Sequence, residues 1–433
     1  MHPVWTLRPT FPQRKDNLTL CHVQYTFLSP KASLCVAPQP NSAAIGPSSR
    51  LASPAPHRSR CSRGSIHGLR MSVIHLETGR DLLGGALQVL YLAQGLQERG
   101  VNSVVMVPKG SEVAEAARKR WLRVEEFTYR GRADALSLAR LAWRFSRSDV
   151  QLVHVHWGPG ADSLGAMAAT AARAPVILTR RAADAETEWM VGAKYGVFHR
   201  VVAISGAVRD LLVEHGVPAE KIALVRDAVD ASDWQESVDA AERNSEFELE
   251  PGVPAGAMVA QFLSRKGHWV LIDALAILKR RGVAPTVVFF GGGPREETVR
   301  TLAEVAGVED RIRFAGFRDD LHRWLGSFDF CVLPALSEGL GVAALQAGAA
   351  GVPVIGARAG GLPEVIEHGR TGVLCPPGDA GALATAIAGI VEDREGARAM
   401  GERARQRVEN LFSVGAMVTG NLDVYREVVR GRG

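Results

Sequence analysis

The chain has 433 residues, of which 46% are hydrophobic and 22% are charged. This length exceeds the size that a single hydrophobic core usually supports, so we expect two domains of ordinary size. The composition is typical of a globular protein and excludes a fibrous or wholly disordered chain. No apolar stretch in the sequence reaches the roughly 18 residues of a membrane-spanning helix, which leaves open a peripheral contact with a membrane.

Positive charge is concentrated at the N-terminus. Residues 1–70 contain nine of the 51 Lys and Arg residues but one of the 46 Asp and Glu residues, so this tail carries +8 and the remainder −3. A net charge of −3 gives no electrostatic reason to bind phosphate backbones, so the sequence argues against a nucleic-acid partner. The cysteines outside the tail, Cys331 and Cys375, have no metal-type spacing, and thiols of this kind favour a cytoplasmic location.

The tail, residues 1–70, contains nine of the 22 prolines and shows no periodic apolar pattern, which predicts disorder. It is either an organelle transit segment or an upstream extension of the reading frame with Met71 as the true start. The second interpretation is favoured because Met71 stands directly before the first convincing strand.

After Met71, short apolar runs alternate with segments of helical period, which predicts a parallel α/β architecture. The strands expected in the first half are Val73–Leu76, Val104–Val107, Leu152–His156, Val176–Thr179 and Val201–Ile204. The strands expected in the second half are Met258–Phe262, Val287–Phe290, Ile312–Phe314, Phe330–Leu333, Val354–Ile355 and Val373–Leu374.

Between the halves, Ala231–Gly256 is polar and acidic and lacks strand or helix period, so it is interpreted as an interdomain linker. We therefore expect two Rossmann-like domains whose parallel sheets face each other across a cleft, with ligands at the carboxyl ends of the strands. The predicted boundaries are 71–232 for the first domain, 233–256 for the linker, 257–410 for the second domain and 411–433 for a C-terminal helix that packs back on the first domain.

The most informative segment runs from Pro334 to Ala350 and reads PALSEGLGVAALQAGAA. A strand leads into a Gly-containing turn and then into a helix of small residues. The N–H groups at the start of such a helix, together with its dipole, favour an anionic or hydroxyl-rich ligand. Glu338, just before the turn, is placed to accept hydrogen bonds from sugar hydroxyls. The N–H groups expected at the ligand belong to Gly339, Leu340, Gly341 and Val342.

Together with the downstream GVPV, GGLPEV and TGVLCPPGD, this segment resembles the C-terminal half of the retaining family 4 glycosyltransferases, which have the GT-B fold. The resemblance covers roughly Met71 to the C-terminus and is most specific between Gly316 and Asp379. It implies a nucleotide-sugar donor site in the C-terminal half and an acceptor site in the N-terminal half. In the family, one Glu contacts the donor sugar and a second Glu, eight positions later, contacts the ribose. Those positions are Glu338 and Gln346 here.

Two positions depart from the family pattern. Gln346 replaces the second Glu, and because an amide still donates and accepts at a ribose diol, we expect altered donor binding more than lost function. In VAQFLSRKG, Lys266 matches the family Lys that neutralises the donor diphosphate, whereas Gln261 stands in place of the family Arg. Arg265 is a candidate for the missing charge or part of a solvated helix start. The GGGP turn around Gly292 suits close approach to a nucleobase or phosphate but is equally a helix-entry loop.

In the N-terminal half, HLETGRDLLGGA places Gly84 and Gly85 between the first strand and helix, where family members carry a Gly-Gly loop beside the acceptor and donor phosphates. His156 matches the family histidine that touches the transferred sugar, although a strand histidine is more often a core residue. Arg180 and Arg181, at a strand end, are candidates for holding an anionic acceptor or the diphosphate, and a surface role is an equal alternative.

These resemblances imply a retaining hexosyltransferase with catalytic roles for Glu338, Lys266 and His156. The acceptor is expected to be a glycan or lipid-linked precursor of the cell envelope, as in lipopolysaccharide biosynthesis. No Asp-x-Asp motif occurs in the chain, so we expect no metal and no other cofactor. Two alternatives stay open: a nucleotide-sugar epimerase or hydrolase on the same scaffold, and a catalytically silent nucleotide-sugar-binding protein.

Overall fold

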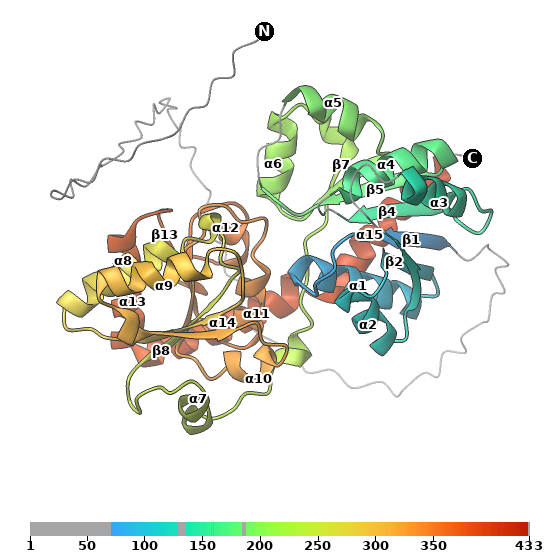
Figure 1. Ribbon diagram of the computed structural model, residues 1–433. Helices are drawn as coiled ribbons and strands as arrows, with labels where there is room; N and C mark the ends of the chain where they lie inside the picture. The colour runs from blue at the N-terminus through green and yellow to red at the C-terminus, as the bar shows by residue number, and fades with distance from the viewer. Residues whose placement is uncertain (1–70, 129–134, 157, 159, 184–187, 432–433) are drawn as a thin grey trace, which may run out of the picture. The chain divides into compact units, whose positions relative to one another are not determined.

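The structure is a computed structural model that describes residues 71–128, 135–156, 158, 160–183 and 188–431. The predictions for residues 1–70 lie outside these ranges. The described chain contains two Rossmann-like α/β units, each built on a parallel sheet (Figure 1). Within these ranges, none of the helices combines the length and the apolar character that crossing a membrane requires.

The first domain has a seven-stranded sheet in the order β3-β2-β1-β4-β5-β6-β7, with all neighbouring strands parallel. Strands β1, β4 and β5 are buried at every position, as expected when helices cover both faces of a parallel sheet. Its strands are β1 Ser72–Leu76, β2 Asn102–Pro108, β3 Arg123–Phe127, β4 Leu152–His156, β5 Val176–Arg180, β6 Arg200–Ala203 and β7 Ile222–Leu224. Its helices are α1 Gly84–Glu98, α2 Glu112–Lys119, α3 Ala135–Phe145, α4 Ala161–Ala172, α5 Glu188–Gly196 and α6 Gly206–Glu214.

The second domain has a six-stranded parallel sheet in the order β10-β9-β8-β11-β12-β13. Its strands are β8 Ala255–Val259, β9 Thr286–Phe290, β10 Ile312–Gly316, β11 Phe330–Leu333, β12 Val354–Ala357 and β13 Gly372–Cys375. Its helices are α8 His268–Arg280, α9 Glu296–Ala306, α10 Leu321–Leu325, α11 Val342–Ala349, α12 Leu362–Val365, α13 Ala380–Glu392 and α14 Arg394–Leu411.

Both sheets reverse their strand order at one point. In the first sheet the reversal lies between β1 and β4, and in the second it lies between β8 and β11. Chain connections leave such a pair of strands in opposite directions, which opens a crevice at their carboxyl ends. The loops that follow these four strands are therefore the expected place for a ligand.

The segment between the domains is more ordered than its sequence indicates. Short helix α7, Ala240–Glu246, forms inside the stretch that we predicted to lack helix period. The Asp239 side chain starts it by accepting hydrogen bonds from the backbone N–H groups of Ala241 and Glu242, at 2.9 and 2.8 Å. An N-cap of this kind stabilises one short turn without any apolar period, so the linker prediction was wrong on this point.

The C-terminal helix α15, Val414–Arg430, contacts the first domain. Figure 1 shows this red helix among the blue and green elements of that domain, and Val418, Leu422 and Tyr425 share a buried cluster with α1. Gly95 of α1 permits the close approach, because a Cβ there would lie 2.5 Å from Val418 Cγ2. Tyr425 consequently reaches the strands of the first sheet.

Candidate active site

A pocket of about 400 Å³ lies where the carboxyl ends of both sheets meet. Its walls come from the segments after β1, β4, β5, β6 and β7 in the first domain and after β8 and β11 in the second. Four of these strands, β1, β4, β8 and β11, are those at which the strand orders reverse. The residues from the first domain are Glu77, Gly79, Asp81, Leu83, Gly84, Gly85, Ala86, Gly158, Arg181, Ala182, Ile204 and Asp227. The residues from the second are Met258, Val259, Ala260, Gln261, Arg265, Lys266, Leu333, Ala335, Glu338, Gly339, Leu340, Gly341, Val342 and Ala343.

An ion pair stands on the second domain's side of this pocket. Lys266 Nζ lies 2.5 Å from Glu338 Oε2, and both side chains are mostly buried. Gly267 makes this pairing feasible, because its left-handed backbone (φ 71°) turns the chain where a Cβ would lie 2.0 Å from the carbonyl oxygen of Pro334. The two loops are also joined by a backbone hydrogen bond from Leu336 N to Arg265 O at 2.7 Å.

The turn after Glu338 is pressed against the first domain. Gly339 lies so close to Arg181 that a Cβ on it would be 2.1 Å from the Arg181 carbonyl oxygen. Ser205 Oγ donates to the carbonyl oxygen of Gly339 at 2.6 Å and also accepts from Val208 N as the N-cap of α6. One hydroxyl therefore caps a helix of the first domain and anchors the loop that lines the pocket from the second.

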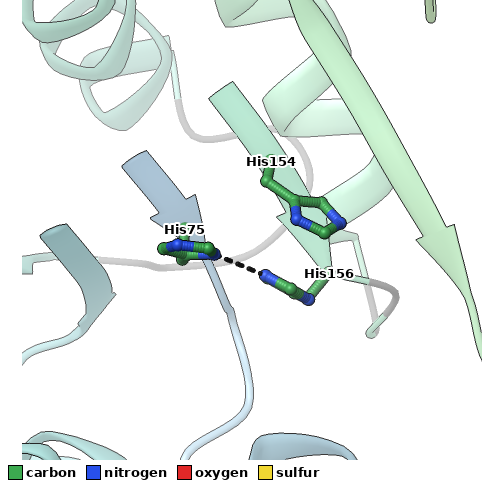
Figure 2. Close-up of side chains that lie close together, drawn as sticks. All are labelled: His75, His154 and His156. Carbon is green, nitrogen blue, oxygen red and sulfur yellow. Dashed lines mark hydrogen bonds between the residues drawn. The ribbon is translucent and has the colours of Figure 1, made fainter. Parts of the chain in front are cut away.

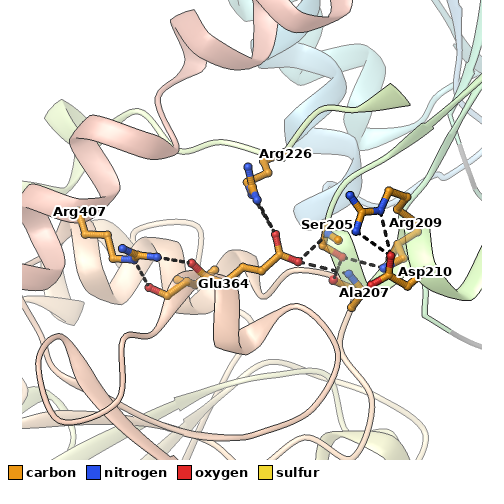
Figure 3. Close-up of polar contacts among 11 residues, drawn as sticks. Ser205, Ala207, Arg209, Asp210, Arg226, Glu364 and Arg407 are labelled. Atoms are coloured by element: carbon orange, nitrogen blue, oxygen red, sulfur yellow. Dashed lines mark hydrogen bonds and ion pairs between the residues drawn. The ribbon is translucent and has the colours of Figure 1, made fainter. Parts of the chain in front are cut away.

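A second contact between the domains lies beside the pocket and is drawn in Figure 3. Glu364 of α12 accepts from the N–H groups of Gly206 and Ala207, at 2.6 and 3.3 Å, at the N-terminus of α6. Its other oxygen accepts from Arg226 Nε at 3.0 Å. The carboxylate thus meets the positive end of a helix dipole and a guanidinium, both from the first domain.

Arg181 is held on the first domain's side of the pocket. Its Nε lies 3.4 Å from Asp227 Oδ1, and its Nη1 lies 3.2 Å from His156 Nδ1. Burial raises the pKa of Asp227, and the guanidinium opposes this effect. Arg181 lines the pocket while it is paired with Asp227, so part of its charge is offset within the protein.

Three histidines form a buried cluster (Figure 2), and one of them, His156, contacts Arg181. His75 Nδ1 lies 3.1 Å from His156 Nε2, and His154 bonds to the hydroxyls of Tyr425 and Thr179, each at 2.6 Å. Burial first, and then Arg181, lower the pKa of His75 to about 3. The pKa values of His154 and His156 are also lowered well below the usual 6.5, chiefly by burial.

The hydrogen bonds assign the tautomers of two of these rings. A guanidinium can only donate, so His156 Nδ1 accepts from Arg181 and the proton of this neutral ring lies on Nε2. His156 Nε2 then donates to His75 Nδ1, which leaves the His75 proton on Nε2. That last atom is buried and has no hydrogen-bond partner among the described residues. Arg181 thus donates to His156, and His156 donates to His75 deeper in the domain.

The cluster also has the proximity of a metal site, since one ligand atom from each ring lies within 4.8 Å of the other two. Hydrogen bonds, however, already engage both nitrogens of His154, both of His156 and Nδ1 of His75. A bound cation would have to break several of these bonds and would face the Arg181 guanidinium. The arrangement therefore favours a hydrogen-bonded cluster that positions Arg181, and it disfavours a metal centre.

The structure brings together most of the residues that the sequence singled out. Those that line the pocket are Lys266, Glu338, Gln261, Arg265, Gly339, Leu340, Gly341, Val342, Gly84, Gly85 and Arg181. His156, Arg180, Gly292 and Gln346 do not line it. His156 is fully buried and touches the pocket only through Arg181, and Arg180 is 2% exposed.

Sequence reasoning missed three acidic residues of the pocket, Glu77, Asp81 and Asp227. For Glu77 and Asp81 the signal was present, because both follow β1 at the carboxyl end of a strand beside the point where the strand order reverses. A second pocket of about 490 Å³ lies at the opposite edge of the first sheet, near Ser72, Asn102 and Gln151. These positions begin or precede strands, where ligands do not usually bind in such folds.

Comparison with known proteins gives the same architecture. Residues 83–233 match the family model of Glycosyltransferase Family 4, and residues 242–407 match that of Glycosyl transferases group 1. The Anabaena protein Alr3699/HepE, solved in complex with UDP and glucose, superposes with a TM-score of 0.73 at 20% identity, covering 83% of this chain and all of that one. The chain therefore carries the two domains of a GT-B glycosyltransferase, and the predicted fold is confirmed.

Curated relatives match over shorter stretches. N-acetyl-alpha-D-glucosaminyl L-malate synthase of Bacillus anthracis is 38% identical over 144 residues, which are 33% of this chain and 38% of that protein. D-inositol 3-phosphate glycosyltransferase of Corynebacterium efficiens is 34% identical over 230 residues, which are 50% of this chain and 54% of that protein. The chain thus matches about a third to a half of the length of these relatives.

Proposed function

We propose that the chain is a glycosyltransferase that moves a hexose-type sugar from a nucleoside diphosphate to a hydroxyl acceptor, with retention and without a metal. The observation that carries this proposal is the Lys266–Glu338 pair in a pocket at the carboxyl ends of both sheets. The family matches of the two domains and the fold shared with a UDP- and glucose-bound protein support a nucleotide sugar as the donor.

The diphosphate belongs on the second domain's side of the pocket. Lys266 and Arg265 supply positive charge there, and α11 begins at Val342, after the N-cap Gly341, with N–H groups at the positive end of its dipole. Fixed charges and dipoles of this kind stabilise the departing diphosphate without reorganisation, which is the role a metal ion fills elsewhere. Glu338, paired with Lys266, is placed to accept hydrogen bonds from the sugar. Retention by a front-face route and the ribose contact of Gln346 rest on the family resemblance.

The acceptor is proposed to be a glycan or lipid-linked precursor of the cell envelope, reached from the cytoplasmic face of the membrane. Exposed side chains on α3 support a peripheral contact, since Leu136 and Trp143 are 68% and 63% exposed. Arg140 on this helix and Arg147 just after its end are exposed, and the Arg147 guanidinium lies 5.4 Å from the Trp143 ring centre. An apolar and basic helix face binds anionic lipid surfaces. Trp143→Ser should weaken cosedimentation with anionic vesicles, and unchanged cosedimentation would remove this support.

A donor screen on the full chain tests the activity. UDP-glucose, UDP-galactose, UDP-N-acetylglucosamine and GDP-mannose are each incubated with the protein and EDTA, with and without a mixture of glycan acceptors. We expect acceptor-stimulated nucleotide release from one donor, and an α-linked product by proton NMR. Glu338→Gln and Lys266→Ala should each lower the rate at least about tenfold, whereas the exposed controls Glu309→Gln and Lys119→Ala should not.

Other outcomes of the screen would identify one of the alternative functions. Nucleotide release or sugar isomerisation that no acceptor stimulates would make the protein a hydrolase or epimerase. Donor binding without any turnover would make it a silent binding protein, with Gln261 in the pocket and Gln346 in α11 as the altered positions. A β-linked product would overturn retention, and turnover abolished by EDTA would overturn metal independence.

A further inference from the structure

Glu77 is a buried acid in the wall of the pocket that the proposed donor chemistry does not use. It follows β1 directly, is 4% exposed, and lines the pocket on the first domain's side. Its Oε1 accepts a hydrogen bond from the backbone N–H of Gly79 at 2.7 Å, and the backbone N–H of Thr78 also favours the charged form of this carboxyl. Among the described residues no Lys or Arg forms an ion pair with it. A carboxylate has capacity for several hydrogen bonds, so these contacts leave acceptor capacity unused.

The charges around Glu77 divide the pocket into two sides. The second domain contributes Arg265 and Lys266 against one acid, Glu338. The first domain contributes three acids to the pocket wall, Glu77, Asp81 and Asp227. Its one cation in that wall, Arg181, is paired with Asp227. A diphosphate is attracted to the second domain's side, whereas an anion on the first domain's side would meet unbalanced carboxylates at short range.

Burial makes the environment of Glu77 selective for ligands without negative charge. Loss of solvent raises the pKa of its carboxyl, against the opposing effects of the Gly79 N–H, of Arg181 and of the Thr78 N–H. A ligand that donates hydroxyl hydrogen bonds would stabilise the carboxylate in place of water. A ligand that brings a second negative charge would add repulsion to a group that is already poorly solvated.

We propose that Glu77 is an acceptor-specificity residue, which accepts hydrogen bonds from hydroxyls of a neutral polyol and rejects acceptors that carry phosphate or carboxylate at this position. The inference rests on the proposed function and names the class of its acceptor. It separates this chain from an enzyme that uses the arginines at the end of β5 to hold an anionic acceptor. Arg180 is buried and does not line the pocket, and Arg181 is paired with Asp227.

The test compares pairs of acceptors that differ in charge, using the donor identified by the screen. The pairs are glucose with glucose 6-phosphate, myo-inositol with inositol 1-phosphate, and methyl glucoside with glucuronic acid. Full-length wild-type protein should glycosylate at least one neutral member, with kcat/KM at least about tenfold above that of its anionic partner. A panel in which no neutral polyol is used faster than its charged counterpart overturns the proposal.

Variants separate recognition from folding. Glu77→Gln keeps an oxygen for the Gly79 N–H but loses the charge, so it should raise the KM for the neutral acceptor and narrow the preference over the anionic one. Donor binding and acceptor-free donor hydrolysis are measured in the same samples. Glu98→Gln, at the exposed end of α1, is the matched control. It should change neither the KM for the neutral acceptor nor the preference over the anionic one. Glu77→Gln with an unchanged acceptor KM and unchanged preference contradicts the assignment.

A second variant covers the case in which Glu77→Gln does not fold. Glu77→Asp keeps the charge with a shorter reach, so it should lower kcat/KM while keeping the preference for neutral acceptors, and a reversed preference counts against the proposal. Donor measurements in the same samples keep the two hypotheses apart. Absent donor binding and hydrolysis refute the proposed function, whereas donor use with a preference for anionic acceptors refutes only the role of Glu77.

Discussion

Acidification should destabilise the first domain through its three buried histidines. In the unfolded chain each histidine binds a proton near pH 6.5. In the folded chain burial lowers the pKa of His75 to about 3 and holds those of His154 and His156 well below 6.5. At pH values between the folded and unfolded pKa values, the unfolded state binds more protons than the folded state, so stability falls as the pH falls.

The size of this effect follows from linkage. Integration of the proton binding of an unfolded histidine from pH 7 to pH 5 gives a loss of about 2 kcal/mol for each buried neutral ring, or about 6 kcal/mol for three. Glu77 and Asp227 act in the opposite direction, because burial raises the pKa of both carboxyls and makes acid favour the folded state. The total pH dependence therefore mixes the two signs, and a variant is needed to isolate one histidine.

His75→Phe isolates that contribution. At pH 7 it should destabilise the protein by about 1–3 kcal/mol, because the donating Nε2 of His156 loses its acceptor. Between pH 7 and pH 5 the variant should lose about 2 kcal/mol less unfolding free energy than wild type. Urea unfolding followed by circular dichroism at both pH values measures this difference. The exposed His322→Asn serves as the control, and equal losses in wild type and His75→Phe would refute the account of a neutral buried cluster.

Three further predictions concern the pocket and the contact between the domains. Lys266→Ala removes the ammonium that pairs with Glu338 and should weaken UDP binding at least about tenfold by calorimetry, so an unchanged Kd would count against its phosphate role. Glu364→Ala leaves two N–H groups of α6 and one arginine without their carboxylate and should lower the unfolding free energy by about 1.5–3 kcal/mol in urea; a smaller change would mean that the contact contributes little. Gly339→Ala places a Cβ 2.1 Å from the Arg181 carbonyl oxygen, so donor turnover should fall at least about tenfold, and wild-type turnover would show that the loop has room to move.

The sequence predicted the fold well because parallel strands leave a strong signal. Buried strands such as β4 and β5 read as short apolar runs, and the Gly-containing turns after β1 and β11 mark the ligand-binding edge. Edge strand β3, Arg123–Phe127, was missed because most of its positions are partly or fully exposed and show no apolar run. Strand β8 was placed three residues late, because it begins with the small residues Ala255 and Gly256, and Gly256 lies against the Phe330 ring.

Only part of the site was predicted, because only some of its residues lie in local sequence motifs. Lys266 and Glu338 lie in motifs with fixed spacing, so the sequence could pair them with a donor. No local pattern shows that His156 hydrogen-bonds to His75, or that Tyr425 from the last helix reaches His154, because these contacts join positions far apart in the chain. The position of His156 beneath Arg181, outside the pocket wall, likewise depends on tertiary packing.

Hydrogen–deuterium exchange in the presence of a nucleotide sugar tests the central claim most directly. With UDP-glucose or GDP-mannose at saturation, we predict slowed exchange in residues 260–266 and 338–343, the segments that carry Gln261, Lys266 and Glu338 of the pocket lining. Residues near Asn102 and Gln151, at the other pocket, should exchange as in the free protein. Protection confined to that second pocket, or no protection with either donor, would contradict a nucleotide-sugar site between the two sheets.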